Sequence, residues 1–485
     1  MLLKTMSFRI AFLVTVLLLI LPQQAFVQDP GTVFDLVIAN GRVIDPESGL
    51  DGVRHVGIVS GAIQSVSDSP LRGRKTIEAS GLIVAPGFID LHSHGQTLEN
   101  YQAKAHDGVT TALEMEVGVG DIDHWYADRA NKAPINYGAT VGHIPNRMAL
   151  LADPGAFLPA ESAISTELSA DQIEEMKQRL RKGLAAGALG IGFGIGYTPA
   201  ATPWEILEMF RVAGEFKAPC YVHLRGGGEA TGVQSLGEVL SASAVSGAPL
   251  HVVHINSTGG DAVPKLMEMI LQARSHGMDV TTEAYPYTAS ATRIESALFS
   301  DGWQSRRNIS YEDVQWAATG ERLTAESFAR YRKEGGSVIV HNMRESNIAL
   351  AVTHPSVIIA SDGNLRDGRG HPRSTGTFAR VLGRYTREQK AMTWSDAIRK
   401  MTLLPAQRLE GRVPAMKNKG RIRAGADADI TIFDPETVTD EATYQDPARY
   451  SRGIPYVLVR GTLVVNEGQL QEAALPGKAI RADRQ

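Results

Sequence analysis

Short apolar segments recur along the middle of this chain, and stretches with helical periodicity separate them. Eight of these segments are candidate strands, and they end near His94, Glu116, His143, Gly196, Arg225, Asn256, Tyr287 and Asp362. The helical stretches between them include 171–186, 203–217, 232–246 and 264–276. Strands that alternate with helices indicate parallel βα units. Eight such units predict an α/β fold, a (β/α)₈ TIM barrel whose site lies at the carboxyl ends of the strands.

The two ends of the chain differ from the middle, because short β-strand patterns follow one another closely there. The segment 35–45 is predicted as a hairpin with Asn40-Gly41 as its turn, since this dipeptide favours tight hairpin turns. Other short strand patterns are 56–59, 62–66, 428–433 and 457–465. We therefore expect a small β-sandwich domain formed from both ends of the chain.

The length of 485 residues is enough for a barrel and one smaller domain. A polar, helix-prone insertion precedes the eighth strand, and long insertions at that face of a barrel often act as lids. The expected segments are an N-terminal export segment at 1–28, the N-terminal half of the β-sandwich at 32–83, the barrel at 84–412 with its lid insertion at about 300–340, the C-terminal half of the β-sandwich at 413–472, and a tail at 473–485.

The first 28 residues have the pattern of a signal peptide. Lys4 and Arg9 give a positive start, and the apolar run 10–21 is too short for a typical membrane span. The segment 25–27 offers a weak cleavage site. We expect an exported protein, periplasmic or extracellular. The alternative is an uncleaved N-terminal anchor, and membrane contact is expected only in that case.

Charge and cysteine content narrow the choices further. The net charge is −4, and no cluster of Lys and Arg indicates nucleic-acid binding. Cys220 is the one cysteine, so the chain can form neither an intramolecular disulfide nor a cysteine-rich metal site.

Side chains that ligate metals or transfer protons stand where predicted strands end. His92 and His94 are two residues apart, so on a strand they share a face. The complete set is His92, His94, Glu116, His223, His254 and Asp362. One such histidine alone is more often structural, but a shared position at converging strand ends predicts a metal site. The histidines without that position are predicted to lie in packing or on the surface: His55, His106, His124, His251, His276, His341 and His354.

Several motifs spread over the chain carry a family resemblance. They include Asn40-Gly41-Arg42-Val43-Ile44-Asp45-Pro46, the segment from Pro86 to His94, Tyr221-Val222-His223-Leu224-Arg225, Ala284-Tyr285-Pro286-Tyr287, His371-Pro372-Arg373 and Gly425-Ala426-Asp427-Ala428-Asp429. With these motifs the chain resembles the amidohydrolase superfamily and, within it, the N-acyl-D-amino-acid deacylase (D-aminoacylase) family. The resemblance implies a zinc-dependent amide hydrolase, with one or two divalent metal ions, that splits N-acyl-D-amino acids into a carboxylate and a free D-amino acid.

The same resemblance implies roles for the site residues. Asp362 would transfer the proton. The tighter metal would lie at Glu116, His223 and His254, and a second metal position at His92 and His94.

Two departures from the family are informative. The family places a metal-binding cysteine at the end of the second strand, and Val117 stands there instead. A carboxylate is the natural replacement, and Glu116 is nearer the strand end than its rival Glu114, which strand alternation puts on the same face. The family also places a lysine two residues after the sixth-strand histidine, where this chain has Asn256.

The resemblance also suggests how substrate is bound. Arg373 matches the family arginine that binds the substrate carboxylate, a role that suits a guanidinium. Tyr287 and Arg225 are expected pocket residues, and Arg293 is expected to compensate for the missing lysine. The expected partner is a small N-acyl amino acid, and a homo-oligomer is left open. Alternatives are a dipeptidase or cyclic-amide hydrolase of the same superfamily, or a catalytically silent scaffold.

Overall fold

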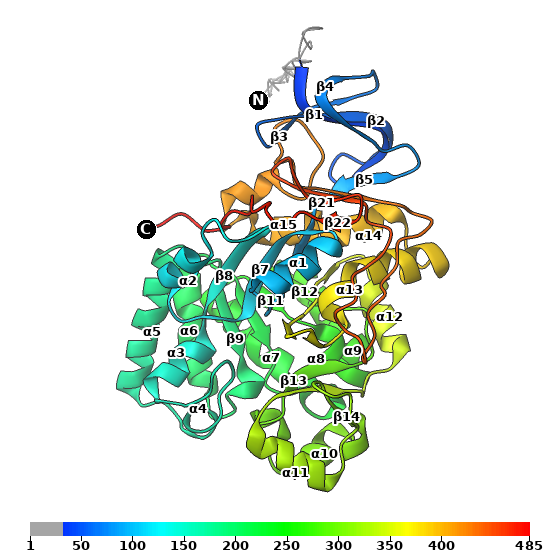
Figure 1. Cartoon of the computed structure of the whole chain (residues 1–485). Coiled ribbons are helices and arrows are strands. Elements are labelled where there is room, and N and C mark those ends of the chain that lie inside the picture. Colours follow the sequence, from blue (N-terminus) through cyan, green and yellow to red (C-terminus); the bar gives the residue numbers. More distant parts are fainter. Residues whose placement is uncertain (1–32) are drawn as a thin grey trace, which may run out of the picture.

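The computed structural model describes residues 33–485, so the predicted export segment lies outside the described residues. A barrel forms the larger part of the molecule, and a β-sheet covers one end of it (Figure 1). Among the helices of the described residues, none is long and apolar enough to cross a membrane.

Eight parallel strands form the barrel, as the alternation of apolar and helical segments predicts. In hydrogen-bonded order they are β6 (Phe88–Asp90), β7 (Val109–Val119), β8 (Asn136–Gly142), β9 (Ile191–Gly194), β10 (Cys220–His223), β11 (Leu250–Val252), β12 (Val280–Ala284) and β16 (Val357–Ile359). Every one of the eight predicted strands is present. Their backbone is mostly buried, which explains why their sequences are nearly continuous apolar runs.

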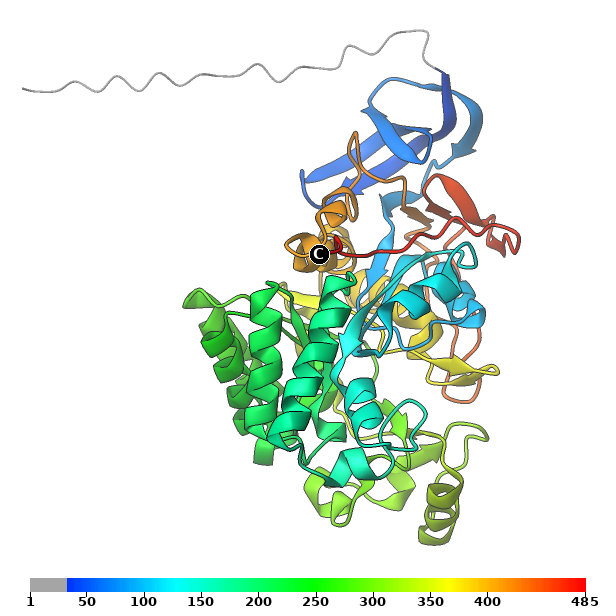
Figure 2. The same cartoon turned by 90° about the vertical axis from the view of Figure 1, so that its left-hand side faces the viewer.

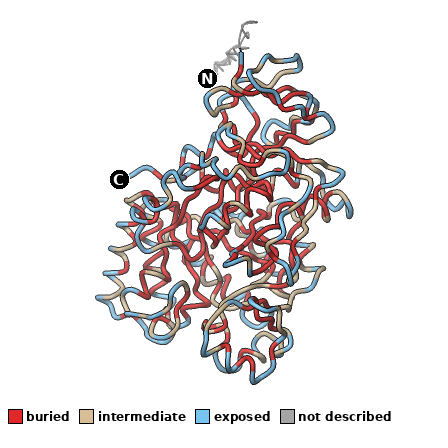
Figure 3. The backbone as a smooth tube through the Cα atoms, viewed as in Figure 1, coloured by how far each residue is buried: buried red, intermediate tan, exposed pale blue. Residues whose placement is uncertain are grey.

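Helices cover the outside of the barrel (Figure 2). The four predicted helical stretches are confirmed as α5 (Ala170–Ala185), α6 (Pro203–Glu215), α7 (Gly228–Ser246) and α9 (Val263–Ser275). In α5, a capping box between Ser169 and Gln172 fixes the first turn. Met176, Leu180 and Leu184 recur every four residues and face the core. Burial is concentrated between the strands and these helices (Figure 3).

The seam between the first and last strands is closed by side chains and one bridge. β6 and β16 are the two ends of the hydrogen-bonded order, and an isolated bridge joins Ser93 to Gly363. The Ser361 backbone donates to Asp90 Oδ1 at 2.9 Å, and the Asp362 backbone donates to the His92 carbonyl at 2.7 Å. The seam therefore holds two predicted site residues next to each other.

Both ends of the chain build one nine-stranded sheet. Its path runs β22-β21-β20-β19-β5-β1-β2-β3, and β4 pairs with β1. The strands are β1 (Val33–Asp45), β2 (Leu50–Val59), β3 (Ala62–Ser67), β4 (Arg72–Glu78), β5 (Ile83–Pro86), β19 (Ile430–Phe433), β20 (Tyr456–Val459), β21 (Thr462–Asn466) and β22 (Gln469–Leu470). Ile38 and Val56 share a core with Ile430 and Leu458, so neither end could bury its apolar face alone.

The predicted hairpin at 35–45 is wrong. These residues form the single strand β1, in which Asn40 has a φ of 59° and the register with β2 shifts between Ile38 and Gly41. Asn-Gly therefore forms a β-bulge instead of a turn. A Cβ at Gly41 would lie 2.4 Å from Val84 Cγ2, so the close approach of β5 requires glycine there.

An insertion between β12 and β16 stands at the carboxyl ends of the barrel strands, at the lower end of Figure 1. It contains a three-stranded sheet and two helices: β13 (Ser290–Arg293), β14 (Val314–Trp316), β15 (Ser337–Val340), α10 (Trp303–Arg307) and α11 (Ala325–Glu334). Phe299, Trp303 and Phe328 belong to its own apolar core. The sequence predicts a helical insertion here, but not its strands.

Candidate metal centre

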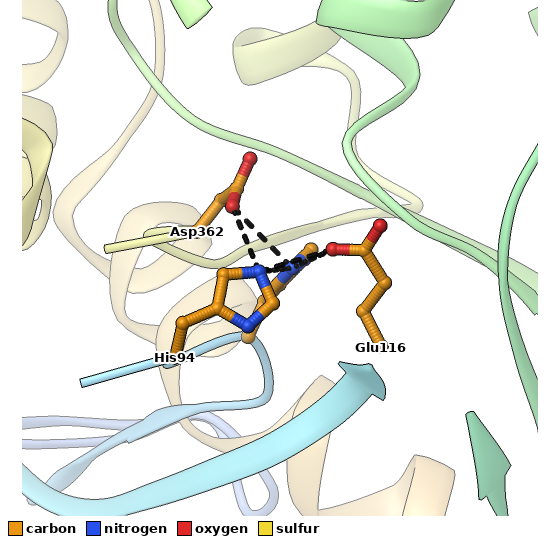
Figure 4. A group of neighbouring side chains, drawn as sticks. His94, Glu116 and Asp362 are labelled. Atoms are coloured by element: carbon orange, nitrogen blue, oxygen red, sulfur yellow. Dashed lines mark hydrogen bonds and ion pairs between the residues drawn. The ribbon is translucent and has the colours of Figure 1, made fainter. Parts of the chain in front are cut away.

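Glu116 stands at the centre of a cluster of imidazoles at the carboxyl ends of the barrel strands. His92 and His94 follow β6, and their Nε2 atoms are 3.0 Å apart. Glu116 Oε2 lies 2.7 Å from the first of these atoms and 3.1 Å from the second (Figure 4). The spacing of two residues after a strand thus brings both imidazoles to one carboxylate oxygen.

The other oxygen of the same carboxylate faces a second pair of histidines. Glu116 Oε1 lies 2.8 Å from His223 Nδ1 and 3.7 Å from His254 Nε2. His223 ends β10, and His254 follows β11 with a φ of 32°. A positive φ on a histidine is strained and is typical of functional sites. Glu116 therefore lies between two groups of candidate metal ligands.

Two further carboxylates orient the first pair of imidazoles. Glu283 Oε1 lies 2.5 Å from His92 Nδ1, and Glu114 Oε2 lies 2.8 Å from His94 Nδ1. An ionised carboxylate can only accept, so each Nδ1 carries a proton, and in the neutral imidazole that a metal binds each Nε2 keeps a lone pair. This arrangement is typical of histidines that bind metals.

These residues fit a metal ion by the chemistry of their donors. The Nε2 lone pairs of His92 and His94 converge with Glu116 Oε2, and three acceptors that face one another need a cation between them. Two groups of four and three ligands, which share Glu116, place their ligand atoms within 4.8 Å of one another. Nitrogen and oxygen ligands of this kind suit zinc and its neighbours.

The charge of the cluster supports the same conclusion. Burial lowers the pKa of His92, but Asp362, Glu283 and Glu116 outweigh it and raise this pKa to about 10. Burial likewise lowers the pKa of His94, and Glu114 with Asp362 raises it well above its usual value. The carboxylates thus stabilise positive charge at this point, and either protons or metal ions can supply that charge.

Asp362 faces the first pair of histidines from the end of β16. Its Oδ1 lies 3.5 Å from His92 Nε2 and 3.3 Å from His94 Nε2, and its Oδ2 lies 3.0 Å from Arg373 Nη2. Burial raises the pKa of Asp362, but Arg373 and the imidazoles outweigh it and hold the pKa below its usual value. The carboxylate is therefore ionised at neutral pH and ready to accept a proton.

A large cavity of about 910 Å³ opens beside this cluster. His223, His254 and Asp362 line it on the barrel side, and residues of the insertion line it on the other. Arg225 also lines it, with two hydrogen bonds of 2.9 and 2.7 Å to Glu238.

The other predicted substrate-binding residues, unlike Arg225, are not among the residues that line this cavity. Arg373 is buried against Asp362, and its guanidinium lies 4.5 Å from the Tyr285 ring centroid. The Tyr287 hydroxyl donates to Asp440 at 3.2 Å, and Arg293 pairs with Glu295. The structure thus brings Arg373 to the centre and commits Tyr287 and Arg293 to contacts elsewhere.

Asn256, which replaces the family lysine, and Glu114, the rival of Glu116, both make contacts within the protein. Asn256 exchanges hydrogen bonds with the backbone of Tyr285, at 3.2 and 3.3 Å. Glu114, the rival to Glu116, contacts the far nitrogen of His94 and accepts from the Val117 backbone at 3.1 Å. Strand alternation alone could not separate the two glutamates.

Sequence reasoning missed Glu283 and assigned His251 to packing. Both are buried, and His251 Nε2 lies 3.0 Å from Glu283 Oε2 while the other oxygen contacts His92. His251 Nδ1 in turn contacts Thr281 Oγ1 at 2.7 Å. Glu283 is the one charged residue in the short strand pattern Val280–Ala284, and this position is the signal that could have pointed to it.

The barrel, with its histidines and carboxylates at the strand ends, defines a metal-dependent hydrolase of the amidohydrolase class. A family model described as the amidohydrolase family matches residues 141–465, and the chain belongs to this family.

Individual relatives are similar over almost the whole chain. N-acyl-D-glutamate deacylase of Alcaligenes xylosoxydans xylosoxydans is 30% identical, over 93% of this chain and 97% of the relative. D-aminoacylase of the same organism is 28% identical, over 90% of this chain and 95% of the relative. A crystal structure of N-acyl-D-glutamate deacylase from Bordetella bronchiseptica, complexed with zinc and a phosphonate inhibitor, is 28% identical, with a TM-score of 0.80 over 93% of this chain and 100% of that chain.

Proposed function

We propose that this protein is a zinc-dependent hydrolase that cleaves N-acyl-D-amino acids into a carboxylate and a free D-amino acid. The observation that carries the proposal is the position of Glu116, with one oxygen facing His92 and His94 and the other facing His223 and His254. Relatives named for deacylation of N-acyl-D-amino acids match more than nine-tenths of the chain, which supports this substrate class.

Zinc would be held by the residues around Glu116. His92, His94 and Asp362 would serve one position, and His223 and His254 the other. A bound zinc ion supplies Lewis acidity, which makes water more acidic and the scissile carbonyl more electrophilic.

The chain's own residues supply the proton transfers. Asp362 starts ionised because Arg373 and the imidazoles stabilise its charge, so Oδ1 can accept the proton of the attacking water. The same oxygen can then donate that proton to the leaving amine. Arg373 holds Oδ2 during both steps, so the carboxylate keeps its orientation.

Turnover of a small substrate panel by the zinc-loaded protein tests the proposal. The panel consists of N-acetyl-D-leucine, N-acetyl-D-glutamate, their L enantiomers, a dipeptide and a hydantoin. Release of free D-amino acid from the N-acetyl-D compounds is expected, with little from the L compounds. Cleavage of the dipeptide or the hydantoin alone would instead assign the protein to the neighbouring activities of the superfamily.

We also propose that the protein is exported. The positive start and the short apolar run before residue 28 support this location. Cell fractionation of the full chain, with N-terminal sequencing of the product, tests it. A mature start near residue 28 in the exported fraction is expected, and an intact terminus in the membrane fraction would indicate an uncleaved anchor.

A further inference from the structure

The cavity beside the metal centre lies between the barrel and the insertion. Residues of β13, such as Ser290 and Thr292, and residues of α10 form the insertion side. A substrate with its scissile bond at Asp362 would therefore extend into the space between the barrel and the insertion.

Positively charged side chains are abundant on the cavity wall, but most of them already bind carboxylates or carbonyls of the protein. Four arginines line the cavity: Arg225, Arg306, Arg307 and Arg344. Three of them are held by the protein: Arg225 by Glu238 at 2.7 Å, Arg344 by Asp261 at 3.1 Å, and Arg306 by the Ser300 carbonyl at 3.0 Å.

Arg307 differs from these three. It is the last residue of α10, and its Nη1 atom is buried without a hydrogen-bond partner among the described residues. Burial lowers the pKa of Arg307, which Tyr197 and Tyr285 oppose. A guanidinium nevertheless stays charged in proteins, so a buried donor and its positive charge are left uncompensated.

The carboxylates of the cavity wall cannot serve Arg307, since each has another cation. The pairs are Glu229 with Lys265 at 3.3 Å, Glu238 with Arg225 at 2.7 Å, Asp261 with Arg344 at 3.1 Å, and Asp362 with Arg373 at 3.0 Å. Among the four arginines that line the cavity, Arg307 is therefore the one whose guanidinium has neither an ion pair nor a hydrogen bond within the described part of the chain.

The position of Arg307 relates it to the metal centre. Tyr197, whose side chain raises the pKa of Arg307, lies with its ring centroid 4.7 Å from that of His223. Arg307 thus lines the same cavity as Tyr197 and the candidate metal ligands His223 and His254, and a substrate bound in that cavity can bring an anionic group to it.

We propose that Arg307 binds a carboxylate of the substrate, so that the insertion recognises the anionic part of the molecule that the barrel hydrolyses. This inference rests on the proposed function. The carboxylate has two sources, the α-carboxylate of any N-acyl amino acid or the distal carboxylate of an acidic side chain, and a guanidinium pairs with either.

The variant Arg307→Gln tests the proposal with four substrates: N-acetyl-D-leucine, N-acetyl-D-leucinamide, N-acetyl-D-glutamate and N-acetyl-D-glutamine. Loss of a charge-assisted hydrogen bond is expected to lower kcat/KM roughly tenfold or more, through KM. A loss with N-acetyl-D-leucine but not with its amide assigns the α-carboxylate. A loss with N-acetyl-D-glutamate alone assigns the distal carboxylate.

Arg306→Gln is the matched control, because it removes the same charge from the neighbouring position of α10. Its kcat/KM is expected to stay within about twofold of the parent protein. Arg307→Lys should restore part of the KM. An equal loss with all four substrates would assign Arg307 a structural role, and no loss with any of them would also overturn the proposal.

Calorimetric binding of the same four compounds to the zinc-loaded protein separates this proposal from the proposed function. If the parent protein hydrolyses none of them, the proposed function fails. Arg307 is then judged by binding alone: tighter binding of the acids than of the amides, abolished in Arg307→Gln, supports the assignment. Equal binding of acids and amides overturns it.

Discussion

At the scale of single residues, the site depends on how buried charges stabilise one another. Asp362 is buried, yet its pKa lies below the usual value, because Arg373 and two imidazoles outweigh the effect of burial. Burial raises the pKa of Glu283 as well, but His92 and His251 lower it to about 2. Carboxylates that stay ionised while buried can orient histidines and accept protons.

Asp362→Asn is expected to abolish most of the turnover. An amide cannot accept the proton of the attacking water, so kcat should fall by roughly 10²–10⁴. Zinc at the position of Glu116, His223 and His254 should remain, because these three residues are unchanged, so elemental analysis should still find zinc in the variant. Substantial residual turnover would contradict the role of Asp362 in proton transfer.

Arg373→Ala is expected to change the pH profile. Removal of the guanidinium takes away the largest influence that stabilises the ionised Asp362, so the pKa of this carboxyl should rise. Because the base is active when ionised, the acidic limb of kcat/KM should move to higher pH. A rise in KM without a shift of that limb would instead mean that Arg373 only binds substrate.

At the scale of elements, neighbouring helices are joined by buried polar contacts as well as by apolar faces. Lys400 lies in α14 (Trp394–Met401) and is buried. Its Nζ donates to the carbonyl of His354, which follows α12 (Glu345–Thr353). Burial, with Arg399 as a smaller influence, lowers the pKa of Lys400 to about 7.

Lys400→Met is therefore expected to change how stability depends on pH. Between about pH 7 and pH 10 the unfolded chain keeps the lysine proton that the folded protein releases, so this group makes the parent protein more stable as the pH rises. The free energy of unfolding of the variant, relative to the parent, should be highest near pH 6 and should fall toward pH 10. Denaturant titrations at both pH values measure it. A relative free energy that does not depend on pH would contradict the lowered pKa.

At the scale of the whole molecule, the candidate ligands come from strands all around the barrel. They lie on or after β6, β7, β10, β11 and β16, and two of these strands border the seam that lacks a regular ladder. A metal ion bound at Glu116 would hold these strands together, and ligands that bind the folded state stabilise it.

Removal of metal by a chelator is thus expected to lower the melting temperature of the protein. The loss of stability is roughly 2.7 kcal/mol if free zinc was at about 100 times its Kd. Differential scanning calorimetry measures it, and added zinc should restore the original value. In His254→Ala the chelator should have a smaller effect. An unchanged melting temperature in the parent protein would argue against metal at this centre.

Much of this organisation could be predicted from the sequence because it depends on local patterns. The eight strands and the helices between them follow from apolar periodicity, and the site residues follow from their position at strand ends. The bulge at Asn40-Gly41 could not be predicted, since this dipeptide forms a turn or a bulge according to which strands lie beside it. The choice between Glu114 and Glu116 likewise depends on where the imidazoles lie.

The sequence by itself therefore determined the barrel, the contribution of both chain ends to one small β domain, and the residue types gathered at one face. Tertiary structure alone decided which oxygen faces which histidine, that Glu283 and His251 support His92, and that Arg307 Nη1 has no hydrogen-bond partner among the described residues. The physical reason is the separation along the chain of the residues that interact. Periodicity follows from neighbours in the chain, whereas hydrogen bonds and buried charges depend on residues that are more than a hundred positions apart and meet only on folding.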